Sequence, residues 1–219
     1  MEIFFVGSNA LRLAQGVLLT LQIACVSLVF SIFGGLLLGY MMSLKHFFVW
    51  TLCRFYLECM RIIPILAWLF IVFFGLAQAF DINLSAITSA IVVFSLWGVA
   101  EMGDLVRGAI TSLPAHQTQS AKALGLNGVQ ITIYIILPQA LKQLLPPTIS
   151  LFTRMIKTTS LVALLGVVDL LKVGQQIIEL NKSNPHASFW VYGGIFCTYF
   201  LLCYPLSYIS KILEKKYQQ

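Results

Sequence analysis

Long stretches without any charged side chain are the feature that most limits how this chain can fold. Residues 13–44, 62–80, 82–100 and 183–210 contain no Asp, Glu, Lys or Arg. A helix needs about 20 apolar residues to cross the hydrocarbon core of a bilayer. Each stretch can therefore hold one crossing. The second and third stretches are only just long enough, so the charges at their ends must lie near the membrane surface.

The overall composition supports the same interpretation. Of 219 residues, 59% are hydrophobic and 10% are charged, and the mean hydropathy is +0.89. A soluble domain carries about 25% charged residues. So few charges cannot cover a surface that faces water. We therefore expect lipid to surround most of the chain.

We predict an all-α integral membrane protein in which residues 1–219 form a single transmembrane domain with five transmembrane helices. The expected spans are 16–40, 59–78, 84–106, 145–165 and 188–209, with a loop at 111–143. Span four is the most difficult to place, because Pro138 interrupts the apolar segment 131–141. We expect that segment to lie near the cytoplasmic interface. The first span lacks a basic leader and is too long for a signal peptide, so we expect it to be retained.

Glycines and basic residues add two structural predictions. Gly35 and Gly39 are spaced to let helix backbones approach closely. With five spans, one side of the membrane holds Arg12, Lys172 and Lys182. The other side holds nine basic residues: Lys45, Arg54, Arg61, Arg107, Lys122, Lys142, Lys211, Lys215 and Lys216. Basic residues collect in the cytoplasm, so we expect the N-terminus outside and the C-terminus inside. This asymmetry explains the net charge of +6 better than a nucleic-acid partner does.

The sequence has no pattern for enzymatic or metal chemistry. Its five cysteines lie in or beside apolar stretches without CxxC spacing, and its three histidines are far apart. It also lacks the GxxxxGK[ST] loop that cradles nucleotide phosphates. We therefore expect no catalytic site, no metal and no cofactor, and any ATP hydrolysis would need a separate subunit.

The loop at 111–143 contains a short helix with clear start and stop signals. Pro114 suits the first turn, and Gly125 can take the left-handed conformation that ends a helix, with Leu126 packing back on Ala121 as in a Schellman motif. Side chains recur at helical spacing at Gln117, Ser120, Ala121 and Leu124. Such a helix could press into a groove on a partner protein or lie on the lipid surface. Spacing alone leaves both alternatives open.

The same loop resembles the EAA motif of ABC-importer permeases. Here the motif reads Gln119-Ser120-Ala121, three residues, Gly125, nine residues, and Ile135-x-Leu137-Pro138. In such permeases the loop forms a coupling helix that sits in a cleft of an ATPase subunit. Gln119 and Ser120 replace the usual Glu and Ala, so a salt bridge to the ATPase is not expected from position 119, where a neutral hydrogen bond could replace it. The resemblance implies ATPase coupling through Gln119, Ser120, Ala121, Leu124, Gly125 and Leu126.

Further segments, in order along the chain, resemble the polar amino acid permease family, the histidine, glutamine and arginine uptake type. They include Gly16-x-x-x-Thr20-Leu21, Tyr56-Leu57-Glu58-x-x-Arg61-x-x-Pro64, Asp104-x-x-Arg107-Gly108 and Lys157-x-Thr159-Ser160-Leu161. The family more often has an aromatic residue at position 101, where this chain has Glu101. The resemblance implies a type I ABC importer permease of the MetI-like fold.

Charged and polar residues inside the predicted spans are candidates for the substrate path. A charge at mid-bilayer costs about 2.5–3.5 kcal/mol on insertion scales. The candidates are Arg61, Pro64, Glu101, Asp104, Lys157, Thr158, Thr159 and Ser160. Arg61 could snorkel to the interface or line the path, whereas Asp104 is expected to pair with Arg107, three residues later.

Two interpretations are open for Glu101, and two for the hydroxyl side chains of residues 158–160. Glu101 could meet the amino group or a cationic side chain of a substrate, or it could pair with Lys157 or Arg154. We favour the ion pair. The hydroxyls of residues 158–160 could bind a substrate carboxylate or bond back to the helix backbone, and the sequence favours neither.

The resemblance implies a permease subunit of an ATP-driven amino acid importer in the bacterial cytoplasmic (inner) membrane. The implied partners are a second permease, identical or related, two ATP-binding subunits, and a periplasmic or extracellular binding protein that delivers a polar amino acid. The alternative is an uncoupled channel or facilitator, which would need no nucleotide partner. A membrane-embedded enzyme is disfavoured, because Glu101 and Asp104 are the only paired acids and no histidine supports them.

Overall fold

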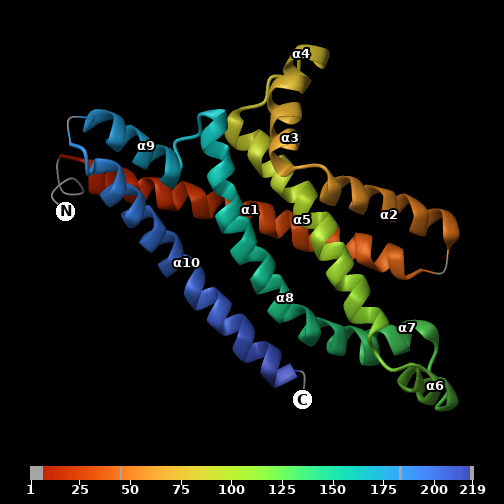
Figure 1. The fold of residues 1–219 in the computed structure, drawn as a ribbon. Coiled ribbons are helices and arrows are strands. Elements are labelled where there is room, and N and C mark those ends of the chain that lie inside the picture. The colour runs from red at the N-terminus through yellow and green to blue at the C-terminus, as the bar shows by residue number, and fades with distance from the viewer. Residues whose placement is uncertain (1–6, 45, 183, 218–219) are drawn as a thin grey trace.

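The computed structural model describes residues 7–44, 46–182 and 184–217, and every regular element in these ranges is helical. Figure 1 shows four long helices: α1 (Asn9–Ser43), α5 (Ala86–Thr111), α8 (Leu137–Thr158) and α10 (Ala187–Tyr217). The shorter α-helices are α2 (Phe47–Ile62), α3 (Ile65–Phe70), α4 (Leu76–Phe80), α6 (Ala115–Ala123), α7 (Gly128–Ile131) and α9 (Leu170–Leu180). The predicted all-α class is confirmed. Lys45, counted above on the predicted cytoplasmic side, lies outside the described residues.

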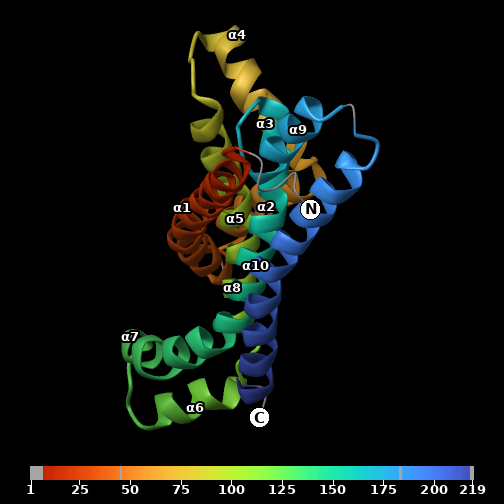
Figure 2. The same ribbon diagram turned by 90° about the vertical axis from the view of Figure 1, so that its left-hand side faces the viewer.

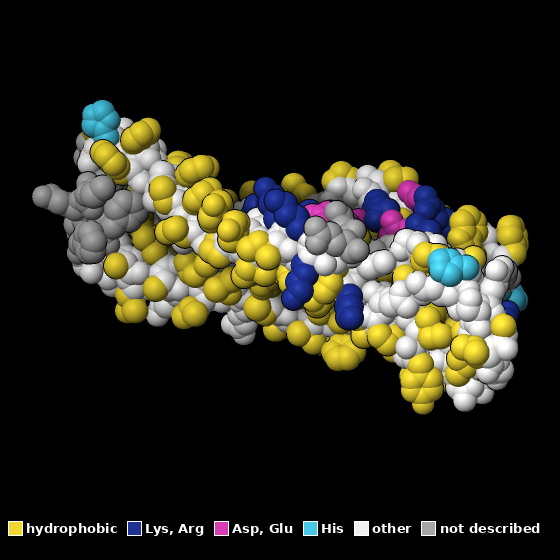
Figure 3. All heavy atoms as spheres, turned by 90° about the horizontal axis from the view of Figure 1, so that it is seen from below, with side chains coloured by type: hydrophobic (Ala, Val, Ile, Leu, Met, Phe, Trp, Pro, Cys, Tyr) yellow, Lys and Arg dark blue, Asp and Glu magenta, His cyan; other side chains and the backbone are white. Residues whose placement is uncertain are grey.

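Four helices in these ranges are long and apolar enough to cross a membrane. They are Asn9–Ser43, Ala86–Thr111, Gly128–Leu165 and Ala187–Tyr217. A fifth crossing is obtained if Phe47–Ile62 and Ile65–Phe80 together make one broken span. On the face drawn in Figure 3, apolar side chains cover much of the surface, while Lys and Arg gather near the middle and towards one end. That distribution suits a chain surrounded by lipid.

The expected second span is bent rather than straight. Ile63 has φ −78° and ψ 127°, so the chain is extended between α2 and α3, and the helices on either side meet at 98°. The cause is Pro64, which has no backbone N–H and disfavours helical geometry in the residue before it. The sequence analysis placed Pro64 near the start of a span at 59–78, whereas a 16-residue helix precedes it.

The prolines of the fourth span do not interrupt its helix. The helical segment runs from Gly128 to Leu165, so residues 131–141, which were expected to lie near the cytoplasmic interface, are helical and continuous with the predicted fourth span. The π-helical segment η3 (Thr132–Ile136) precedes Pro138. A proline ring clashes with the carbonyl four residues earlier, and a wider π turn at that carbonyl relieves the clash.

The sequence analysis missed α9, which follows the 3₁₀ segment η4 (Thr159–Leu165). Gly166, with φ 84°, ends η4, and Asp169 then caps α9 by accepting the N–H of Lys172 at 2.9 Å. The buried face of α9 packs on α1 and α10 and is formed by Leu170, Val173, Gly174 and Ile177. The helix is short and amphipathic, so hydropathy alone does not reveal it.

Small residues bring α1 and α5 close together, as the glycine spacing predicted. A Cβ added to Gly35 would lie 2.4 Å from Cβ of Met102, and one added to Gly39 would lie 2.5 Å from Cβ of Val106. On α5, a Cβ at Gly98 would lie 1.9 Å from Oγ of Ser31. In lipid, helices associate through such close packing because the hydrophobic effect does not drive them together.

We therefore expect Gly98→Ala to destabilise the protein. The added methyl group must displace Ser31, whose Cβ would lie 2.7 Å away, and Cε of Met155 at 2.8 Å, and overpacking of this kind costs about 1–3 kcal/mol. Gly108→Ala, on the same helix but with nothing within 4 Å of the added Cβ, is the matched control. Thermal unfolding of the detergent-purified variants measures the effect. Equal melting temperatures for both variants would contradict the packing account.

A second prediction concerns Asp169, which is fully buried and whose Oδ2 has no hydrogen-bond partner in the described residues. Burial removes water from the carboxylate and raises the pKa of Asp169 to about 6, above the value of about 3.9 in an unfolded chain. The folded protein thus holds this proton more tightly than the unfolded chain does. The resulting stabilisation is complete below the unfolded pKa and is lost as the pH rises through 6.

Asp169→Asn should therefore raise the melting temperature at pH 8 and have a smaller effect at pH 5. Asparagine keeps an oxygen that can cap α9 but never ionises, so it avoids a cost of about 2–3 kcal/mol at high pH. Thermal unfolding of both proteins at the two pH values tests this expectation. A variant that is less stable than the parent at pH 8 would show that the ionised carboxylate is favourable where it lies.

Candidate functional site

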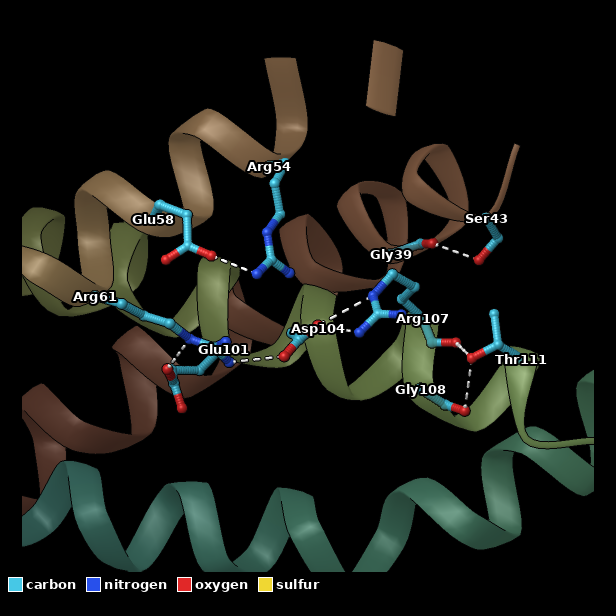
Figure 4. A network of polar contacts seen from close by, with 10 residues as sticks. All are labelled: Gly39, Ser43, Arg54, Glu58, Arg61, Glu101, Asp104, Arg107, Gly108 and Thr111. Carbon is cyan, nitrogen blue, oxygen red and sulfur yellow. Dashed lines mark hydrogen bonds and ion pairs between the residues drawn. The ribbon is translucent and has the colours of Figure 1, made fainter. Parts of the chain in front are cut away.

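Glu101 is the centre of a network of charges that joins three helices. It lies on α5, and 11% of its side chain is exposed. Its Oε1 accepts a hydrogen bond from Nε of Arg61 on α2 at 2.8 Å (Figure 4), and its Oε2 accepts one from Nη2 of Arg154 on α8 at 2.6 Å. Both oxygens are therefore paired. The structure confirms the ion pair with Arg154 and adds Arg61, which the sequence analysis did not pair with Glu101.

Asp104 extends this network by one helical turn along α5. Its Oδ2 lies 3.0 Å from Nη2 of Arg61, and its Oδ1 accepts from Nη2 of Arg107 at 2.7 Å (Figure 4). The pair with Arg107 is the one that the spacing predicted. Arg61 thus bridges the two carboxylates, and it lies three residues before the bend at Pro64. The network holds the bend of the broken span against α5.

The energetic role of these pairs follows from where they lie. Removing one partner of a fully buried ion pair costs about 3–5 kcal/mol, because the other charge is left uncompensated. The cost is smaller here, because the side chains of Arg61 and Arg154 are 34% and 49% exposed. Glu101 is the most enclosed member, and it contacts helices that are 40 and 53 residues away in sequence. The network therefore stabilises one arrangement of α2, α5 and α8.

The other candidate path residues on this part of α8 lie elsewhere. Lys157 is exposed and lines a separate cavity with Tyr199 and Phe200 of α10, so it does not pair with Glu101. The hydroxyls of Thr158, Thr159 and Ser160 donate to helix carbonyls at 2.8, 2.7 and 2.9 Å. For these hydroxyls the structure favours the backbone alternative over a carboxylate site.

Sequence reasoning missed the surroundings of Arg154. Its Cζ lies 5.6 Å from the centre of the Trp97 ring, within the range of a cation–π contact. Trp97 is one turn before Glu101 on α5, so one helix provides both contacts. Arg154 also lines a cavity of about 710 Å³ between α5, α8 and α10. The sequence around Arg154 does not indicate this cavity, because α10, which is distant in the sequence, forms one of its walls.

The loop between α5 and α8 protrudes from one end of the long helices (Figure 2). There α6 ends in the predicted Schellman motif: Leu126 donates to the carbonyl of Ala121 at 3.2 Å, and Gly125 donates to that of Lys122 at 2.9 Å. Gly125 has φ 83°. The end of the helix is therefore fixed by a residue that tolerates the left-handed region.

The predicted coupling residues of α6 differ in their exposure. Ala121 is buried, whereas Gln119, Ser120 and Leu124 are exposed, and Leu124 is 82% exposed. The helix is tied to α8 by a hydrogen bond of 2.8 Å from Nε2 of Gln139 to Oε1 of Gln117. Leu124, at the end of α6, is thus one apolar side chain that remains exposed next to polar ones.

The sequence analysis missed a helix-capping motif that directly follows α6. Asn127 and Gln130 exchange hydrogen bonds of 2.9 Å in a capping box that starts α7. The loop is therefore a pair of capped helices rather than an irregular connection.

Comparison with known proteins identifies relatives along nearly the whole chain. Residues 31–219 match the family model described as the binding-protein-dependent transport system inner membrane component. The chain is 28% identical over 215 residues to a putative glutamine transport system permease protein, GlnP, of Rickettsia conorii, covering 98% of this chain and 94% of the relative. It is 33% identical over 207 residues to a probable amino-acid ABC transporter permease protein, YckA, of Bacillus subtilis, covering 93% and 88%.

Solved structures share the fold. A chain in the crystal structure of an amino acid ABC transporter with histidines superimposes with a TM-score of 0.88 at 23% identity, covering 99% of both chains. A chain of the inward-facing MetNI methionine ABC transporter gives a TM-score of 0.75 at 17% identity, covering 94% of this chain and 98% of that one. The expected MetI-like fold is confirmed.

The family match covers most of the chain, and the relative at 33% identity aligns with 93% of it. This chain therefore belongs to the family of binding-protein-dependent transport system inner membrane components, and it is a membrane-spanning permease subunit.

Proposed function

We propose that this chain is the permease subunit of an ATP-driven importer, and that with a second permease, identical or related, it forms the path for a polar amino acid. The amino acid is delivered by an external binding protein, and ATP is hydrolysed on two separate ATP-binding subunits. The relatives named above include a glutamine and an amino-acid permease, which supports an amino acid as the substrate.

The observation that carries the proposal is the protruding, capped helix α6. It combines a fixed end at Gly125 with exposed side chains at Gln119, Ser120 and Leu124. A rigid helix with an exposed apolar tip suits insertion into a groove of a partner. With Gln119 at the first position of the motif, the contact with the ATP-binding subunit is a neutral hydrogen bond rather than a salt bridge.

A series of contacts connects α6 to the charged network around Glu101. The bond between Gln139 and Gln117 ties α6 to α8, and α8 carries Arg154, which holds Glu101 of α5. Glu101 in turn holds Arg61 beside the bend at Pro64. We infer that closure of the ATP-binding subunits displaces α6 and rocks α8 against α5 and α2. Such rocking of helices around a central site is how alternating access operates in transporters.

The orientation of the chain in the membrane is part of the proposal. A docked α6 must lie in the cytoplasm, and α10 ends near the same end of the molecule as α6 in Figure 2. The basic side chains Lys211, Lys215 and Lys216 of α10 support a cytoplasmic C-terminus.

A cytoplasm-active fluorescent reporter fused after Tyr217 should be active, and a reporter that works only in the periplasm should be inactive there. The same periplasmic reporter inserted at Asn184, between α9 and α10, should be active, because one crossing of α10 separates the two positions. Activity of the periplasmic reporter after Tyr217 would reverse the proposed topology.

The docking role predicts that Leu124→Asp lowers the amount of co-expressed ATP-binding subunit that purifies with the tagged permease. A charge at the centre of an apolar contact should reduce association about tenfold or more. Leu180→Asp is the matched control, because Leu180 is 75% exposed at the end of α9 and far from α6 in Figure 1. Equal recovery of the ATP-binding subunit with both variants would place the docking surface elsewhere.

Gly125→Pro tests the cap rather than the surface. Proline cannot adopt φ 83° and has no N–H to donate to Lys122, so the end of α6 should lose its form while the variant stays in the membrane. ATP-dependent uptake should be abolished. Uptake at the parental rate would rule out a coupling role for this helix end.

A further inference from the structure

The guanidinium of Arg154 is held on one side and open on the other. In the described parts of the chain, the acceptor it contacts is Oε2 of Glu101, at 2.6 Å, and one face rests on the Trp97 ring. A guanidinium carries five N–H donors in a planar fork. The contact with Glu101 uses Nη2, so donors on the other two nitrogens remain. About half of the side chain (49%) is exposed.

The cavity beside Arg154 is lined by further polar side chains. The Ser210 hydroxyl donates to the carbonyl of Pro146 at 2.8 Å and lies 3.0 Å from the Ser150 hydroxyl. The carbonyl oxygen of the Gln143 side chain accepts from Ser112 at 2.9 Å, which leaves its amide N–H groups as donors. Glu214, also at the wall, has a partner of its own.

The charged network beside the cavity holds one more positive than negative group, and Glu214 adds a carboxylate at the cavity wall. The network contains three guanidinium groups, those of Arg61, Arg107 and Arg154, and two carboxylates, those of Glu101 and Asp104. Each carboxylate contacts two guanidinium groups. Arg154 is the most exposed of the five side chains of the network, and it lines the cavity together with Glu214.

The volume also fits a small ligand. Pockets for small molecules have volumes of about 300–1,000 Å³, and this cavity measures about 710 Å³. It is formed by α5, α8 and α10, and the rocking motion proposed above would move α8 against α5.

We propose that Arg154 binds a carboxylate group of the transported amino acid in this cavity, and that Glu101 and Trp97 are positioning residues that hold its guanidinium towards the ligand. The inference rests on the proposed function and deepens it by naming the group that is recognised. It also assigns Glu101 a role other than contact with a substrate amino group, because both its oxygens are occupied by arginines.

A carboxylate could come from the α-carboxyl group, which all amino acids share, or from an acidic side chain. Three probes separate these sources: L-glutamine, L-glutamate, and L-glutaminamide, in which the α-carboxylate is replaced by an amide. L-arginine and L-argininamide form a second pair. Binding is measured by calorimetry on the purified complex of the permeases with their ATP-binding subunits, without the binding protein.

Arg154→Gln should weaken binding of the preferred amino acid about tenfold or more, because charge-assisted hydrogen bonds to a carboxylate are lost. Arg154→Lys should also weaken it, because an ammonium group lacks the fork that reaches Glu101 and the ligand together. Lys142→Gln removes a cation from an exposed position on the same helix outside the cavity and should leave affinity unchanged. Preference for L-glutamine or L-arginine over its α-amide identifies the α-carboxylate, and preference for L-glutamate over L-glutamine identifies a side-chain carboxylate.

The double variant Glu101→Gln with Arg154→Gln separates binding from folding. It removes both members of the ion pair and leaves Arg61 its contact with Asp104. Affinity should stay as low as in Arg154→Gln alone, because the group that contacts the ligand is still missing. Recovery of affinity would show that Arg154 serves only to neutralise Glu101, and would overturn the inference.

Two further outcomes also overturn it. If the parent complex binds the amino acids and their amides equally well, and does not distinguish L-glutamate from L-glutamine, Arg154 does not read a carboxylate, although the proposed function stands. If the parent complex binds none of the probes, the inference is wrong. ATP-driven amino acid uptake by that same complex then decides whether the proposed function survives.

Discussion

The pairing of the Glu101 carboxylate is the interaction on which the arrangement of the central helices depends. A carboxylate inside a membrane bundle is tolerated when its charge is compensated and its oxygens accept hydrogen bonds. Here Arg61 of α2 and Arg154 of α8 each occupy one oxygen. Three helices distant in sequence are thereby joined beside a core cluster to which the same helices contribute apolar side chains, among them Met60, Ala100 and Met155.

The same contacts connect the bend at Pro64 with the long helical segment Gly128–Leu165 through α5. Arg61 lies just before Pro64, so its bonds to α5 hold α2 where the chain turns by 98°. Arg154 lies on a helix that continues back to the α6 loop, where Gln139 contacts Gln117. A displacement of α6 therefore has a direct mechanical route to the charged network. A chain of packed helices with discrete contacts is the kind of connection that carries such coupling.

The sequence predicted the features that depend on local chemistry. Charge-free stretches located α1, α5 and α10, Gly35 and Gly39 indicated close packing of α1, and Gly125 with Leu126 indicated the Schellman motif that the structure contains. These signals act over a few residues, so no knowledge of the tertiary arrangement is needed to read them.

Features set by tertiary context could not be derived in this way. Pro64 breaks its helix, whereas Pro138, Pro146 and Pro147 lie within a continuous helical segment, and local sequence does not separate the two outcomes. The choice between Arg154 and Lys157 as the partner of Glu101 depends on how α8 is rotated about its axis. The helix α9 is too short and amphipathic to appear in a search for spans.

The central claim is that this permease moves an amino acid inward at the expense of ATP. Uptake of labelled L-glutamine and L-arginine into liposomes tests it most directly, with the permease, its partner permease and the ATP-binding subunits in the membrane, ATP inside, and the binding protein outside. The account predicts accumulation of at least one amino acid above its external concentration, lost when ATP or the binding protein is omitted. Equilibration of the amino acid without ATP would contradict it and would show an uncoupled channel.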